Sequence, residues 1–175
     1  KRVSHLPQKA GHSSMVWLLI IFCLAVAVSP LLCMKSSPRQ QHITDCRRKA
    51  RGLSIHVNLR RRPGALETEH RIDTVYYWLP WLKAKKVQGW ILHRSSRRGW
   101  ESSFDNWRWI NNEANKEWHE IITACLSELP EGITAIQVSS EGVGLVWDER
   151  GTIDLIDKIH ASLLKLRQKG EEIFS

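Results

Sequence analysis

The sequence predicts an α+β protein in which an N-terminal transmembrane helix precedes a small, mostly antiparallel sheet with two helices packed on one face. Three observations predict this class. Residues 15–34 form an apolar run without a single charge. Several later segments alternate apolar and polar residues, which is the period of a strand, and two others repeat apolar residues every three or four positions, which is the period of an amphipathic helix. The 175 residues suffice for one domain with an appendage.

The overall composition excludes several classes of protein. Apolar residues make up 42% of the chain and charged residues 25%, which is ordinary for a folded protein and excludes a disordered tail. Four cysteines exclude a disulfide-rich scaffold. The net charge of +8 is unevenly distributed, because nine basic residues and one acid lie in 35–62. This basic block adjoins the apolar run, not the centre of the folded domain, so the charge pattern argues against a nucleic-acid partner.

The apolar run at 15–34 follows a short N-terminal segment at 1–14. Twenty residues in a helix rise about 30 Å, which is the thickness of the hydrocarbon core of a bilayer. Trp17 lies near one end of the run, where indole rings favour the interface. Basic residues follow the run closely, whereas at most three precede it, and the positive-inside rule therefore predicts a cytoplasmic C-terminal domain.

A cleaved signal peptide is the alternative interpretation of the same segment. Basic residues precede the run, and Ala25-Val26-Ala27 fits the small-x-small pattern of a cleavage site. The apolar sequence continues past that site to residue 34, and the basic block that follows resists export. We therefore expect an anchor, with an exported envelope binding protein as the alternative.

A basic linker is predicted at 35–52, between the anchor and the domain. Its cations are expected to contact anionic lipid headgroups, and they also serve as the topology signal. Cys46 is followed by three basic residues, which are expected to lower its pKa and make it the most reactive thiol. The predicted lipid contacts are Trp17, Lys35, Arg39, Arg47, Arg48, Lys49 and Arg51.

The soluble domain is predicted at 53–170, followed by a tail at 171–175. Strands are expected at 53–59, 74–79 and 87–93, with a short fourth strand over 106–110, and a hairpin joins strands at 133–138 and 143–147. The first strand should bury Leu53, Ile55, Val57 and Leu59.

Two helices complete the predicted domain. One, over 114–129, presents Ala114, Trp118, Ile121, Ile122, Cys125, Leu126 and Leu129 on one face. The last helix begins after Thr152 and ends before Gly170. Its inward residues should be Ile153, Ile156, Ile159, Leu163 and Leu164.

No pattern of catalytic or ligand-binding residues is present in the sequence. His and Cys spacings typical of metal sites are absent, as are the glycine-rich phosphate loops and the Gly-x-Ser-x-Gly pattern of serine hydrolases. We therefore predict no catalytic, cofactor-binding or metal-binding residue and a non-enzymatic function.

Nine tryptophans are the one unusual count in the sequence. The apolar patterns place Trp118 and Trp147 in the core. The others either fill a small core or form an aromatic contact surface, since tryptophan is enriched at binding hot spots. The candidate partner surface consists of Trp78, Trp81, Trp100, Trp107 and Trp109.

Four short segments resemble a bacterial protein family. They are Ser29-Pro30-Leu31, Ser37-Pro38-Arg39-Gln40, Ala50-Arg51-Gly52-Leu53 and Leu145-Val146-Trp147-Asp148-Glu149. In these segments the chain is similar to short single-span inner-membrane proteins of pseudomonad-type gammaproteobacteria, some of which are labelled YajC-like preprotein translocase subunits. The chain lacks the Gly-Asp-Glu-Val-Val-Thr type of motif found in true YajC proteins. The resemblance implies an inner-membrane location and no catalytic residues.

Together these observations predict a single-pass inner-membrane accessory or scaffold protein. Its expected contacts are a bilayer with anionic headgroups and a protein partner bound by the cytoplasmic domain. In the alternative, an exported protein with a cleaved signal peptide binds an envelope ligand on its tryptophan-rich surface.

Overall fold

A computed structural model describes residues 11–33, 37–65, 74–83, 86–94 and 98–174. The chain forms two compact units, 1–41 and 42–175, and each is described by itself. In the first unit, α1 (Gly11–Cys33) is a helix of 23 residues whose side chains are exposed over 15–26. Within the described part of the chain, no helix combines the length and the apolar character needed to cross a membrane. The predicted lipid contact Lys35 lies outside the described residues.

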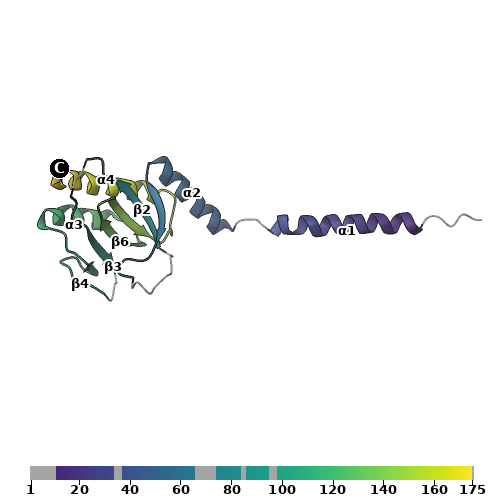
Figure 1. Cartoon of the computed structure of the whole chain (residues 1–175), viewed down its shortest axis with the longest axis horizontal. Coiled ribbons are helices and arrows are strands. Elements are labelled where there is room, and N and C mark those ends of the chain that lie inside the picture. Colours follow the sequence, from purple (N-terminus) through teal and green to yellow (C-terminus); the bar gives the residue numbers. More distant parts are fainter. Residues whose placement is uncertain (1–10, 34–36, 66–73, 84–85, 95–97, 175) are drawn as a thin grey trace, which may run out of the picture. The chain divides into compact units, whose positions relative to one another are not determined.

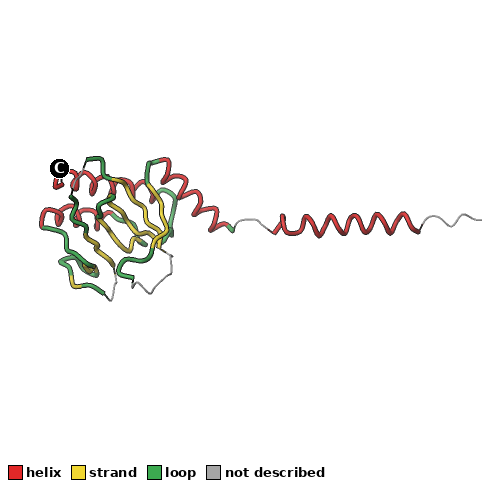
Figure 2. Tube along the Cα trace, viewed as in Figure 1, coloured by secondary structure: helices red, strands yellow, loops and turns green. Residues whose placement is uncertain are grey.

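The second unit is an α+β domain, as the sequence predicts. Its described residues form one sheet of seven strands, all paired antiparallel, in the order β1-β2-β7-β6-β3-β5-β4. Figure 2 distinguishes the strands of this unit from its helices by colour. The strands are β1 (His56–Arg60), β2 (Thr74–Pro80), β3 (Trp90–Arg94), β4 (Trp100–Glu101), β5 (Trp107–Ile110), β6 (Ile133–Val138) and β7 (Gly142–Trp147). The helices are α2 (Pro38–Gly52), the short 3-10 helix η1 (Lys116–Trp118), α3 (His119–Glu128) and α4 (Leu155–Phe174).

The strand register separates the two faces of this sheet. One row of paired residues crosses it through Val57, Tyr77, Leu145, Ile136, Leu92 and Trp109. All of them belong to the main core or pack against it, and α3 and α4 lie on this side (Figure 1). Successive side chains of a strand alternate between faces. The neighbouring row, which includes His56, Trp78 and Gly144, therefore lies on the opposite, open face.

The helix α2 takes part in the domain and is not a solvated linker over its whole length. Ser37 Oγ accepts a hydrogen bond from the Gln40 backbone N–H, which caps the helix start, and Pro38 occupies the first turn. Further along, Cys46 and Ala50 are fully buried in the main core. The predicted boundary at residue 53 is therefore about three helical turns too late, because the compact unit begins at residue 42.

Most predicted strands form, but burial differs on the first of them. Ile55 is buried, whereas Val57 is only half-buried and Leu59 is 54% exposed. The expected burial of Leu59 is wrong because β1 is the outermost strand, with no further strand beside it among the described residues.

The last helix also departs from the prediction. It continues through Gly170 to Phe174, and Leu164 lies on its exposed side. A Cβ at Gly170 would lie 2.4 Å from the Trp81 ring and 3.1 Å from the Trp118 ring. Gly170 is therefore not a helix end but the place where two indole rings approach the α4 backbone.

Candidate functional site

The open face of the sheet carries an unusual group of side chains at the β1–β2 edge. Trp78 stacks on its cross-strand partner His56, with ring centroids 4.8 Å apart. With its side-chain amide oriented to satisfy both groups, Asn58 accepts a hydrogen bond from Trp78 Nε1 and donates to the Val57 carbonyl, each at 3.0 Å. An exposed sheet face usually presents polar side chains to water. Here a half-buried indole ring is instead held in a fixed position.

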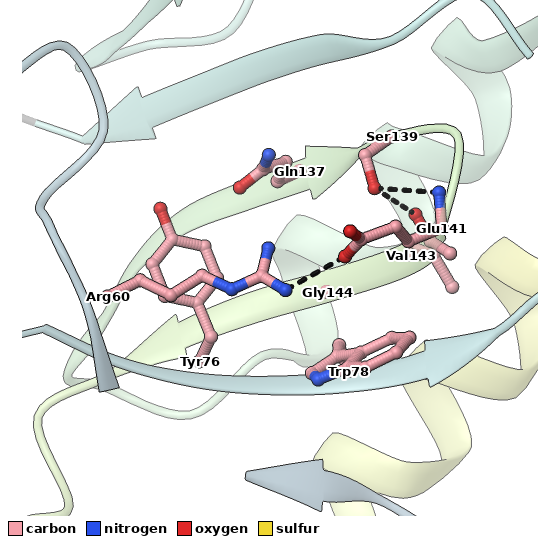
Figure 3. Close-up of a pocket in the computed structure, with 9 residues that line it drawn as sticks. Arg60, Tyr76, Trp78, Gln137, Ser139, Glu141, Val143 and Gly144 are labelled. Carbon is pink, nitrogen blue, oxygen red and sulfur yellow. Dashed lines mark hydrogen bonds and ion pairs between the residues drawn. The ribbon is translucent and has the colours of Figure 1, made fainter. Parts of the chain in front are cut away.

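Arg60 lies across the same aromatic surface. Its guanidinium carbon is 5.8 Å from the ring centroids of both Tyr76 and Trp78, within the range of cation–π attraction. One terminal nitrogen donates to Glu141 at 2.8 Å, from the turn between β6 and β7 (Figure 3). Arg60 therefore ties the outermost strand to a hairpin 81 residues away in sequence.

Glycines form the floor of this surface beside the aromatic rings. Gly144 faces Trp78 in register, and a Cβ there would lie 3.1 Å from the Trp78 Cβ. The shallow hollow is lined by Arg60, Tyr76, Trp78, Gln137, Ser139, Glu141, Gly142, Val143 and Gly144 (Figure 3).

Tyr76 is the most deeply buried aromatic residue of this surface, and Arg60 lies over its ring. It packs with Ala135 and Val146 in a small buried cluster on the open face. Burial raises the pKa of the Tyr76 hydroxyl, and the charge of Arg60 opposes this shift only in part. Tyr76 is therefore neutral at physiological pH and serves as a packed support, not as an acid or base.

A second polar cluster lies beneath α2 on the other face. Arg47 donates two hydrogen bonds of 2.7 Å to the buried carboxylate of Glu149, from Nε and from a terminal nitrogen. The Tyr77 hydroxyl donates to the same carboxylate at 2.9 Å. Burial and the Glu149 charge raise the pKa of the Tyr77 hydroxyl. These contacts hold α2 on the domain.

Cys46 lies in this region, and the prediction of a reactive thiol is wrong. Its side chain is fully buried, with Sγ 3.4 Å from His42 Nε2. Burial and the negative charge of Glu149 raise the pKa of Cys46, and the charge of Lys49 does not reverse the shift. The basic neighbours in sequence point to other partners, so the thiol stays protonated and shielded.

The predicted lipid-contact residues fall into two groups, because some are exposed and others have partners within the domain. Trp17 and Arg39 are exposed in the first unit. In the second unit, Arg48 pairs with the nearby Asp45, and Arg51 Nε donates to the Arg47 carbonyl oxygen.

Arg47 and Lys49 are bound by carboxylates of the domain. Lys49 Nζ lies 2.7 Å from Asp157 and 3.8 Å from Asp154. The expectation of a headgroup contact is wrong for Arg47, because its guanidinium faces the buried Glu149.

The five tryptophans of the predicted partner surface do not form one surface. Trp109 is fully buried, so its assignment to a contact surface is wrong. Trp81 packs on Phe174 and donates from Nε1 to the Ser139 carbonyl at 2.7 Å. Trp107 packs against the core on the helix side, and Trp100 is 43% exposed at the far edge strand. Only Trp78 lies on the open face.

The buried tryptophans instead build the core, which confirms the expectation for Trp118 and Trp147. Trp90 packs edge-to-face against both Trp109 and Trp118, with ring centroids 5.7 and 5.2 Å apart. Such edge-to-face pairs contribute beyond their buried area. The high tryptophan count is therefore largely a property of packing.

Arg60 and His56 belong to this site but were not predicted from the sequence. Both stand on the polar side of the first predicted strand, and Tyr76 and Trp78 are two apart on the second. The sequence did contain a signal for this site. Two aromatic residues alternate on one predicted strand, and the polar face of the neighbouring strand carries His and Arg. Their pairing depends on the β1–β2 register, which the sequence alone does not fix.

Neither a search for metal-ligating side chains nor comparison with known proteins identifies a further site. Among the residues that the structure describes, no group of three or more His, Cys, Asp or Glu side chains could hold a metal ion. Comparison of the chain with protein-family models, with curated proteins and with solved structures found no match.

Proposed function

We propose that this chain is a non-enzymatic scaffold whose domain binds a protein partner on the open face of its sheet, at the surface formed by His56, Arg60, Tyr76 and Trp78. The observation that carries this proposal is the fixed Trp78 ring between His56 and Arg60. Trp, Tyr and Arg are the residue types that dominate binding energy at protein interfaces.

The shape of the surface favours a macromolecule over a small substrate. The hollow beside Trp78 has a volume of only about 10 Å³. Sites for small molecules and cofactors usually enclose roughly 300–1,000 Å³. A flat aromatic surface with one ion pair is suited to a complementary protein surface.

The same proposal places the uncharged run at 15–34 in a bacterial inner membrane and the domain in the cytoplasm. Its support is the sequence alone, in which the twenty uncharged residues at 15–34 would rise about 30 Å as a helix. The basic residues that follow the run favour the cytoplasmic side for the domain.

Site-specific photo-crosslinking in living bacteria tests the partner surface. A photoreactive amino acid replaces Gln137, on the open face, or Glu120, which is exposed on α3. We expect a discrete cross-linked protein from position 137 and none from position 120. Cross-links of equal yield at both positions, or at neither, would contradict the proposal.

A C-terminal green fluorescent protein fusion tests the location, because this reporter matures in the cytoplasm. We expect fluorescence in washed membranes. A full-length fusion that is made but stays dark would support the exported alternative, with an envelope ligand such as glycan on Trp78.

A further inference from the structure

The outer edge of β1 is unpaired among the described residues. β1 stands first in the sheet and pairs only with β2. Half of its backbone N–H and C=O groups point away from β2 and have no strand to pair with in the described part of the chain. Natural sheets usually protect such an edge, because it is a template for a further strand.

A groove runs beside this edge, between β1 and α2. Its volume is about 340 Å³, and it is lined by Arg47, Arg51, Val57, Asn58 and Leu59. Val57 and Leu59 project to the α2 side and leave apolar surface there, with Leu59 54% exposed. The groove thus offers backbone hydrogen-bonding groups, an apolar floor and a cationic wall together.

The positive charge beside β1 indicates which kind of peptide segment could bind along this edge. Residues 51–62 include four arginines and no acid. Among the described residues, Arg47 is neutralised by Glu149 and Arg60 by Glu141, whereas Arg51 donates from its Nε to a backbone carbonyl and has no carboxylate partner. Arg51 therefore keeps an unneutralised positive charge at the groove.

A second copy of the chain does not suit this edge. A β1 strand from a second copy would bring no carboxylate to Arg51, because residues 51–62 contain no acid. An acidic strand would instead be attracted.

We propose that the β1–α2 groove binds an extended acidic segment of a protein partner, which adds to the sheet beside β1. The backbone of the segment pairs with β1, alternate side chains lie on Val57 and Leu59, and a carboxylate pairs with Arg51. Five residues suffice to match β1, a span of about 17 Å. This inference goes beyond the function proposed above, because it uses the edge of β1 and not the open face.

Selection from a random twelve-residue peptide library on the immobilised full-length chain tests this inference. We expect the enriched peptides to be rich in Asp and Glu. By fluorescence anisotropy, Arg51→Glu and Leu59→Lys should each weaken the best peptide at least about tenfold. Hydrogen exchange should slow in β1 when the peptide binds.

Matched variants control for charge and exposed apolar surface elsewhere. Leu82→Lys removes another exposed leucine, and Lys158→Glu reverses another exposed charge. Both should bind the peptide within about twofold of the unchanged chain. The inference is overturned if no peptide is enriched, if the peptides lack acidic residues, or if Arg51→Glu and Leu59→Lys bind normally. Binding lost in Trp78→Ala but kept in those two variants would also overturn it, while supporting the open-face site.

Discussion

The two faces of the sheet use the same residue types for different purposes. On the helix-covered face, tryptophans such as Trp109 are fully buried and packed edge to face. On the open face, Trp78 is half-buried and held by His56 and Arg60. Burial on the first face provides cohesion, whereas partial exposure on the second leaves aromatic surface for contact.

The ion pairs of the two faces differ in the same way. Arg47 and Glu149 form a bidentate pair in which the Glu149 side chain is 5% exposed. Arg60 and Glu141 form a single contact in which the Glu141 side chain is 59% exposed. Chemically identical partners are therefore a structural link on one face and a solvated bridge on the other.

The tryptophans give the largest expected difference. Trp109→Ala should lower the free energy of unfolding by about 3–5 kcal/mol, because it leaves a cavity under the helices. Trp78→Ala should cost clearly less, about 1–2 kcal/mol, because its ring is partly solvated. Urea denaturation followed by circular dichroism measures both. Equal losses would show that the open face is as important to cohesion as the core.

The buried ion pair should give the next largest effect. Arg47→Met removes the guanidinium and leaves the Glu149 carboxylate buried with Tyr77 as its remaining donor. We expect a loss of about 2–3 kcal/mol in urea denaturation. The double variant Arg47→Met, Glu149→Met should recover part of this loss, since no unpaired buried charge remains. A double variant less stable than the single one would contradict this account, because Glu149 would then stabilise the fold without the guanidinium of Arg47.

His93 should give the domain a moderate pH dependence. It lies on the open face opposite Arg108, and burial together with the positive charge of Arg62 lowers its pKa in the folded state. The unfolded chain therefore takes up the proton first as the pH falls. Stability should be complete above about pH 6.5 and fall below it, by at most about 1.4 kcal/mol per pH unit.

Urea midpoints between pH 7.5 and 5.5 measure this dependence. His93→Gln should flatten the profile over that range while leaving the fold intact. A profile that is unchanged in His93→Gln would assign the pH dependence to other groups.

The exposed ion pair should give the smallest effect. A double-mutant cycle with Arg60→Ala and Glu141→Ala should yield a coupling of about 0.5 kcal/mol in urea, decreasing with added salt. A coupling above about 2 kcal/mol would mean that Arg60 is as fixed as Arg47, and that the open face is a structural surface.

The periodicity of apolar residues correctly predicted several strands and helices, because the buried face of each is encoded within its own segment. The hairpin at 133–147 and the buried positions of Trp118, Ile122 and Cys125 follow from their periodicity. The strand over 74–79 forms as β2 for the same reason.

The features that the sequence did not predict depend on distant partners. In the sequence, the basic segment of α2 has the pattern of a solvent-exposed helix. In the folded domain it contacts Glu149 and Asp157, which lie more than 100 residues later in the chain. The same holds for Gly170, which marks a helix end by composition and a ring contact by packing. Trp78 was among the predicted contact residues, but its partner Arg60 becomes evident only from the strand register.

The integration of α2 has a practical consequence for recombinant work on the domain. A fragment cut at residue 53, where the sequence places the end of the linker, would lose Cys46 and Ala50 from the core and leave Glu149 without its guanidinium. Proteolytic trimming within α2 would have the same result. A fragment that starts at Ser37 keeps the helix cap and every one of these contacts. The choice of first residue therefore decides whether the core of the domain and the partner of Glu149 are complete.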